Sequence, residues 1–218
     1  MEEKKERRVL TRAETSLFLE SAKKSSYYNL FVLALETGMR VGELCGLMLE
    51  DIDFKKRVLY VRHTLCYFSR DGRYVFEMHA TKTKNGTRAI PLTARAVAVL
   101  KRQLIQRQQI LLKGIETEDE YRNLVFVTRN NRPTQLFLVQ EAIDSVLRKL
   151  REEHPEFERF SPFCFRHTFA TRAIENGVQP KTLQKILGHA SLQMTIDLYC
   201  HVTEDTLFEE MQKMEQAI

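Results

Sequence analysis

Helical patterns surrounding one short, strand-rich segment are the feature that most constrains the fold of this chain. Apolar residues recur at helical spacing over residues 97–111 and again over 139–150. Three earlier runs are instead rich in β-branched and aromatic residues, namely 58–61, 74–78 and 88–92. The turn sequences SRDG and KTKNG separate these runs, which predicts one small antiparallel sheet. We therefore expect an α+β fold that is mostly α-helical.

Start and stop signals divide the first part of the chain into helices. Thr11 followed three residues later by Glu14 is a capping box, which predicts a helix running towards Ala22. The next stretch, YYNLFVLALETG, is apolar almost all round, as in a fully buried helix. Gly38 is placed to end that helix, and another begins near Arg40.

The last third of the chain also carries helix punctuation. The Asn-Gly pair at Gly177 ends one helical segment, and Pro180 starts the next at a favoured first-turn position. Gly188 ends that helix, and Ser191 can cap a further one that runs to Tyr199. These signals predict that the rest of the domain is helical, with the one sheet confined to the earlier part of the chain.

Composition places this chain of 218 residues among ordinary globular proteins, with 43% hydrophobic and 29% charged residues. No apolar stretch approaches the 20 or so residues that a membrane span needs, and no apolar signal region follows the charged start. The cysteines are far apart and lack metal-binding spacing, which is typical of reduced thiols. We expect no membrane association and a cytoplasmic location.

Positive charge is concentrated in one part of the sequence. The net charge is +5, yet residues 55–107 hold thirteen Lys or Arg against two acidic residues, Asp71 and Glu77, a local excess of +11. Such a block indicates contact with a polyanion such as DNA. The alternative is a solvated basic face without a partner.

Two segments carry side chains suited to a phosphate. In TGMRVGEL, Arg40 lies one turn before Glu43, which can orient its guanidinium as a bidentate phosphate clamp. In TKTKNG, Lys82 and Lys84 lie on a hairpin tip, from which a lysine can donate a proton to an alkoxide. An ordinary surface ion pair and a solvated basic tip are the respective alternatives.

A third segment near the end of the chain adds three candidates. Arg166 is placed near the start of a helix, His189 follows a glycine at a helix end, and Tyr199 comes ten residues later. All three side chains can face one pocket. Each also has a structural explanation: Arg166 can cap a neighbouring helix, His189 can bond to a carbonyl, and Tyr199 can be a core aromatic.

Together these segments resemble a known family. The sequences TGMRVGEL, a KTK hairpin ending in IPL, FRHTFAT and LGHASLQMTIDLYCH, in this order, resemble the catalytic domain of tyrosine recombinases, especially phage and conjugative-transposon integrases. The resemblance covers nearly the whole chain. It implies the mostly helical fold with a small sheet that this family shares with type IB topoisomerases, and one catalytic domain over residues 11–218 after a charged leader, 1–10. The family's N-terminal core-binding domain has no counterpart in this chain.

The resemblance also implies roles for individual residues. Arg40 and Arg166 are similar to the two family arginines that bind the nonbridging oxygens of the cleaved phosphate, and His189 to a histidine that adds a hydrogen bond. Tyr199 is similar to the nucleophile, and Lys82 to the hairpin lysine that protonates the departing 5′-oxygen. These five residues are the catalytic candidates.

Supporting residues follow the family pattern less closely. Glu43 matches the acidic residue that supports the first arginine, and Lys84 is the alternative to Lys82. The usual pattern His-x-x-Arg is broken, because Phe163 stands three residues before Arg166 and a phenyl ring exchanges no proton. His167 is adjacent, but one helical step points about 100° away, so we expect it to be buried or capping instead.

The implied reaction needs neither a metal nor a nucleotide. Attack by the family's tyrosine leaves a 3′-phosphotyrosyl enzyme and a free 5′-hydroxyl, so the bond energy is kept for rejoining. The sequence contains no Gly-rich phosphate loop, and acidic pairs such as Asp51 with Asp53 are explained by turn capping. No cofactor is expected.

Double-stranded DNA is the implied partner, at the nucleoid of a cell. The acidic tail, residues 203–218, predicts a helix that docks on protein, and family members exchange such a helix between protomers. A tetramer on DNA, with monomers in free solution, is the implied assembly, and packing on its own domain is the alternative for the tail.

Two rival functions stay open from the sequence. The stretch FATRAIENGVQPKTLQKILGHAS also fits a noncatalytic helix-turn-helix DNA-binding module. A type IB topoisomerase-like strand relaxer would use the same chemistry without exchanging partners.

Overall fold

The computed structural model describes residues 8–80 and 86–199, and for Tyr199 the backbone alone. The α-helices are α1 (Arg12–Ser21), α2 (Tyr28–Thr37), α3 (Val41–Cys45), α4 (Ala94–Leu111), α5 (Leu136–Glu153), α6 (Phe163–Glu175), α7 (Pro180–Leu187) and α8 (Gln193–Tyr199). The strands are β1 (Ile52–Asp53), β2 (Val58–Val61), β3 (His63–Arg70), β4 (Arg73–Ala80) and β5 (Arg88–Pro91). Short 3-10 turns are η1 (Ala22–Lys24), η2 (Leu49–Asp51) and η3 (Asp119–Tyr121). The predicted mostly helical α+β class is confirmed.

The helix ends lie where the sequence signals place them. The Thr11 hydroxyl accepts from the backbone N–H of Glu14, and the backbone N–H of Thr11 donates to the Glu14 carboxylate, which completes the predicted capping box. Gly38 ends α2 in the left-handed conformation (φ 63°). A side chain could not replace it easily, since a Cβ there would lie 2.4 Å from the ring of Phe169. The tight turn at Gly38 places Arg40 at the start of α3.

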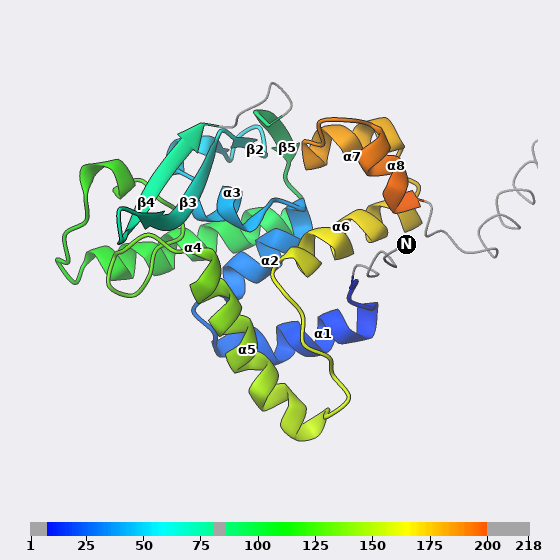
Figure 1. Ribbon diagram of the computed structural model, residues 1–218, viewed down its shortest axis with the longest axis horizontal. Helices are drawn as coiled ribbons and strands as arrows, with labels where there is room; N and C mark the ends of the chain where they lie inside the picture. The colour runs from blue at the N-terminus through cyan, green and yellow to red at the C-terminus, as the bar shows by residue number, and fades with distance from the viewer. Residues whose placement is uncertain (1–7, 81–85, 200–218) are drawn as a thin grey trace, which may run out of the picture.

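The strands form two sheets rather than the single sheet that the sequence predicts. β2 pairs with β1 on one side and β5 on the other, all antiparallel. β3, which the sequence analysis did not assign, forms a separate hairpin with β4 (Figure 1). Its sequence, HTLCYFSR, mixes polar and apolar residues because most of the strand is solvent-accessible, so burial leaves little pattern there. The turn at Asp71 and Gly72, both at positive φ, fixes the pairing.

The core is built around α2, which packs against α4 and α6 (Figure 1). An aromatic cluster joins α1, α2 and α6: the rings of Phe18, Phe31 and Phe160 lie about Phe165, with centroid separations of 5.1 to 5.8 Å among the contacting pairs. Phe165 is fully buried and is followed directly by Arg166. Packing of α6 on α2 therefore fixes where Arg166 lies. Among the helices described, none is long and apolar enough to cross a membrane.

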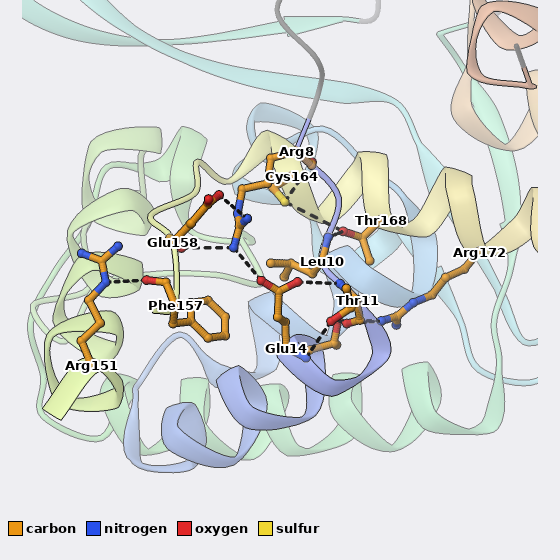
Figure 2. A network of polar contacts seen from close by, with 11 residues as sticks. Arg8, Leu10, Thr11, Glu14, Arg151, Phe157, Glu158, Cys164, Thr168 and Arg172 are labelled. Carbon is orange, nitrogen blue, oxygen red and sulfur yellow. Dashed lines mark hydrogen bonds and ion pairs between the residues drawn. The ribbon is translucent and has the colours of Figure 1, made fainter. Parts of the chain in front are cut away.

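Residues 8–10, within the charged leader expected from the sequence, are docked onto α6 (Figure 2). Leu10 is a core residue, and its backbone N–H donates to the buried hydroxyl of Thr168, 3.0 Å away. The thiol of Cys164 donates to the carbonyl of Arg8, whose guanidinium pairs with Glu14 at 2.7 Å. This part of the leader is thus fastened to the helix that carries Arg166.

Replacing Thr168 by Val should reduce stability, because the buried N–H of Leu10 would lose its acceptor. We expect the free energy of unfolding to fall by about 1–3 kcal/mol in urea denaturation. Thr182→Val, at an exposed position of α7, is the matched control and should change it by less than about 0.5 kcal/mol. Equal effects of the two substitutions would contradict the importance of this contact.

Candidate anion-binding site

Arg40 is held by a buried carboxylate at the start of α3. Its backbone N–H donates to Oε2 of Glu43 at 2.8 Å, and its Nη1 donates to Oε1 at 3.0 Å. The Glu43 side chain is 3% exposed, whereas that of Arg40 is 40% exposed. The carboxylate therefore fixes the guanidinium from the protein side while leaving it accessible to solvent, which agrees with the arrangement predicted for this pair.

Glu43 has a second partner that the sequence analysis missed. Arg88, the first residue of β5, forms a bidentate pair with it, with Nη1–Oε1 and Nη2–Oε2 distances of 3.0 and 2.8 Å. Burial raises the pKa of the Glu43 carboxyl, but the hydrogen bonds and charges of Arg88 and Arg40 outweigh this and leave the pKa below its ordinary value. Glu43 is therefore ionised near neutral pH.

Arg166 enters the same cluster from α6. Its Nη1 donates to the carbonyl of Gly38 at 2.8 Å and its Nη2 to the carbonyl of Leu187 at 2.7 Å. Burial, together with the nearby Arg40 cation, lowers the pKa of Arg166 to about 9, so the group still carries its charge near neutral pH. Three guanidinium groups thus gather around one carboxylate, an excess of positive charge suited to an anion.

His189 lies at the end of α7, beside this cluster. Gly188, in the left-handed conformation (φ 64°), turns the chain so that the His189 ring is buried. Its Nδ1 lies 2.8 Å from Oγ1 of Thr195, which fixes the ring plane. Because Arg166 bonds to the carbonyl two residues before His189, the two candidate residues are linked through the end of α7.

A cavity of about 330 Å³ opens between β5 and α7, which lie side by side (Figure 1). Arg88, His189, Lys181 and Lys185 line it, together with three uncharged residues. A larger cavity of about 640 Å³ is lined mainly by α4, by α5 and by the turn that precedes α2. It includes none of the predicted site residues. Of the predicted catalytic residues, the smaller cavity is lined by His189 but not by Arg40 or Arg166, so it adjoins the arginine cluster on the side of α7.

Two predicted groups lie partly or wholly outside the described residues. The hairpin tip with Lys82 and Lys84 falls in the gap between β4 and β5, and Tyr199 ends α8 without a described side chain. The roles suggested for these three residues stay predictions. Within the described ranges, no group of three or more His, Cys, Asp or Glu side chains is arranged to hold a metal ion.

Phe163 and His167 flank Arg166 on α6. Phe163 is the first residue of the helix and is 51% exposed, so its ring is not needed to fill the core. It lies one helical turn from Arg166, on neighbouring parts of the helix surface. His167 is partly buried. The supporting roles of these two residues stay predictions.

The basic block of residues 55–107 is only partly available to a polyanion. Arg88 is buried against Glu43, and Arg107 is buried on α4, where it donates to the carbonyls of Leu124 and Arg122. Arg62 pairs with the buried Asp51 at 2.8 Å. Several of the thirteen cations thus have structural partners, which a count of charges cannot reveal.

Comparison with known proteins places these features in a family context. Residues 1–206 match the sequence profile described as Phage integrase family. The transposase from transposon Tn916 of Enterococcus faecalis is 32% identical over 211 residues, which cover 94% of this chain and 51% of that protein. A tyrosine recombinase XerC-like protein of Caldanaerobacter subterraneus is 30% identical, over 79% of this chain and 45% of its own. The chain spans about half the length of the curated relatives it matches.

Solved structures give the same picture. The Tn1549 transposon integrase in complex with transposon right end DNA superposes with a TM-score of 0.84 and 31% identity, covering 98% of this chain and 68% of that chain. The XerA recombinase, at 24% identity and a TM-score of 0.69 over 98% of this chain and 65% of that one, shares the fold.

If the arginine cluster binds an anion, inorganic phosphate should stabilise the protein. At ten times its dissociation constant, a ligand of the folded state adds about 1.4 kcal/mol, or about 3–6 °C in Tm for a chain of this size. Differential scanning calorimetry in phosphate, against chloride of equal ionic strength, measures the shift. Arg40→Ala, which alters a half-exposed side chain, should abolish most of it, and an unchanged shift in that variant would argue against the site.

Proposed function

Because the chain belongs to the phage integrase family, we propose that it is the catalytic domain of a site-specific DNA recombinase. It would cut and rejoin DNA strands through a 3′-phosphotyrosyl intermediate, without a metal ion or ATP. The observation that carries this proposal is the cluster in which Arg40 and Arg166 converge beside His189, with excess positive charge. This arrangement suits the charge that develops on a phosphodiester during substitution at phosphorus.

In the proposed reaction, the phenolic oxygen of Tyr199 attacks the phosphorus and the bond to the 5′-oxygen breaks. Arg40 and Arg166 donate hydrogen bonds to the nonbridging oxygens, where negative charge accumulates, and His189 adds a further one. Lys82, or Lys84 in its place, gives a proton to the departing 5′-oxygen, while the phenol proton passes to solvent. The new phosphotyrosyl bond retains the energy for rejoining by a 5′-hydroxyl.

Double-stranded DNA is the proposed substrate, and the comparisons support it through the DNA complexes of the similar Tn1549 transposon integrase. We also propose residues 11–218 as one catalytic domain, with the acidic tail over 203–218 docking on a neighbouring protomer. A tetramer would then assemble on DNA at the nucleoid, in the cytoplasm. The tail lies outside the described residues.

A covalent adduct tests the proposed chemistry. In a pool of nicked duplexes of randomised sequence, the short product strand diffuses away after cleavage and traps the protein on DNA. We expect DNA that stays attached to the protein after denaturation, with a chelator present, and none with Tyr199→Phe. Attached DNA that persists in Tyr199→Phe, or no adduct from the unaltered chain while duplexes are still bound, would favour the noncatalytic DNA-binding alternative.

A requirement for two specific DNA duplexes distinguishes a recombinase from the rival, a type IB topoisomerase-like strand relaxer. Once a duplex has been recovered from the pool, recombination should need two copies of that site. Relaxation of a supercoiled plasmid that lacks the site, at a rate equal to that with the site, would identify a type IB topoisomerase-like activity instead.

Phe163→His should speed cleavage. The substituted imidazole would lie one helical turn from Arg166, where it can hydrogen-bond to a phosphate oxygen and accept the phenol proton. One positioned donor is worth on the order of a hundredfold in rate, and the exposed position makes the change compatible with folding. Single-turnover adduct formation measures the effect, and an unchanged or lower rate would show that the site works without this histidine.

A further inference from the structure

Arg88 is a buried cation that hydrogen-bonds to two parts of the anion site, Glu43 on α3 and the end of α7. Its side chain is 5% exposed and its two Nη atoms are paired with Glu43. Its Nε donates to the carbonyl of Ile186 at 2.6 Å, and its Nη1 also donates to the carbonyl of Gly86 at 3.2 Å. Three segments far apart in the sequence, α3, β5 and the end of α7, therefore meet on this one guanidinium.

On the α3 side, Arg88 completes the coordination of Glu43. A carboxylate offers about four acceptor positions, and four N–H donors occupy them here: the backbone and Nη1 of Arg40, and both Nη groups of Arg88. A carboxylate bonded on both oxygens cannot rotate freely. By holding the Glu43 carboxylate, Arg88 therefore fixes the orientation of the oxygens that accept from Arg40.

On the α7 side, Arg88 acts together with Arg166. The carbonyls of Ile186 and Leu187 are neighbours in the last turn of α7, and they receive Arg88 Nε at 2.6 Å and Arg166 Nη2 at 2.7 Å. Cations at this helix end also match the negative end of its dipole. The turn that delivers His189 follows directly.

We propose that Arg88 is a positioning residue for the phosphate site: through Glu43 it fixes Arg40, and through the end of α7 it fixes His189. The proposal rests on the proposed function, because the reaction it serves is strand cleavage. Arg88 is buried behind Glu43 and also lines the small cavity beside α7, but the proposal gives it no contact with the phosphate that Arg40 and Arg166 bind. Because Arg88 is the first residue of β5, its hydrogen bonds also connect this strand, which follows the Lys82–Lys84 segment, to Arg40 and Arg166.

A purely structural ion pair is the competing explanation. Buried ion pairs are often no more stabilising than apolar residues of similar size, so stability alone gives weak reason for such a pair. The two explanations differ in what a mild substitution does. Arg88→Lys keeps the charge but cannot hold both carboxylate oxygens and a carbonyl at once, so it should disturb geometry more than folding.

Arg107→Lys is the matched control. Arg107 is another buried arginine that donates to backbone carbonyls, those of Leu124 and Arg122, and none of its hydrogen-bond partners belongs to the anion site. For both variants we would measure Tm, the Tm shift caused by inorganic phosphate, duplex affinity and the single-turnover rate of adduct formation on the duplex recovered from the pool.

We expect Arg88→Lys to slow adduct formation by about a hundredfold, to lose most of the phosphate shift, and to bind duplex within about threefold of the unaltered chain. Arg107→Lys should keep the adduct-formation rate and the phosphate shift of the unaltered chain, even if its Tm falls as much as that of Arg88→Lys. Glu43→Gln should slow cleavage as well, and the double variant should be little slower than either single one, since both act through one carboxylate.

Arg88→Lys that cleaves and binds phosphate like Arg107→Lys would overturn the proposal. So would fully additive effects of Arg88→Lys and Glu43→Gln. If Arg88→Lys does not fold, Arg88→Gln takes its place in the same measurements: loss of the Tm shift caused by phosphate supports the proposal, and a retained shift overturns it. The phosphate shift is measured without DNA, so a failure of the proposed recombinase activity, seen as no adduct from the unaltered chain, is distinguished from a failure of the positioning role.

Discussion

One buried carboxylate holds the candidate site together. Glu43 accepts hydrogen bonds from Arg40 on its solvent side and Arg88 on its protein side, with Arg166 close enough for its pKa to respond to all three. Without this negative charge, three buried or half-buried guanidinium groups would repel one another in a medium that screens poorly. With it, the cluster is stable and still has excess positive charge for an incoming phosphate.

The fold brings these groups together through helix ends rather than helix middles. Left-handed glycines end α2 and α7, and the residues that follow them include Arg40 and His189. The carbonyls exposed at the same two ends, of Gly38 and Leu187, are the acceptors that hold Arg166. Each helix end thus supplies a candidate side chain and a backbone contact, which explains how short segments from distant parts of the chain form one site.

The sequence predicted what local patterns encode and missed what tertiary packing decides. The capping box at Thr11 and the helix end at Gly38 were predicted because both depend on neighbouring residues. Arg88 was missed because it looked like one basic residue among thirteen. The alternation in RAIP does indicate a buried ion pair. Arg88 and Ile90 lie on the same face of the strand, and the buried face of a strand seldom includes an unpaired charge. The sequence predicted β4 in part, as the run 74–78, but missed its partner β3, because most of that strand is solvent-accessible and it carries no strong alternation.

The central claim is that Arg40 and Arg166 bind one and the same backbone phosphate. A crystal structure of the Tyr199→Phe variant with its duplex tests this most directly, since the uncleaved phosphate would stay in place. The account predicts a single phosphate within hydrogen-bond distance of both guanidinium groups, with Glu43 still bonded to Arg40 and Arg88. Two arginines on different phosphates, or DNA bound on another face of the domain, would contradict it.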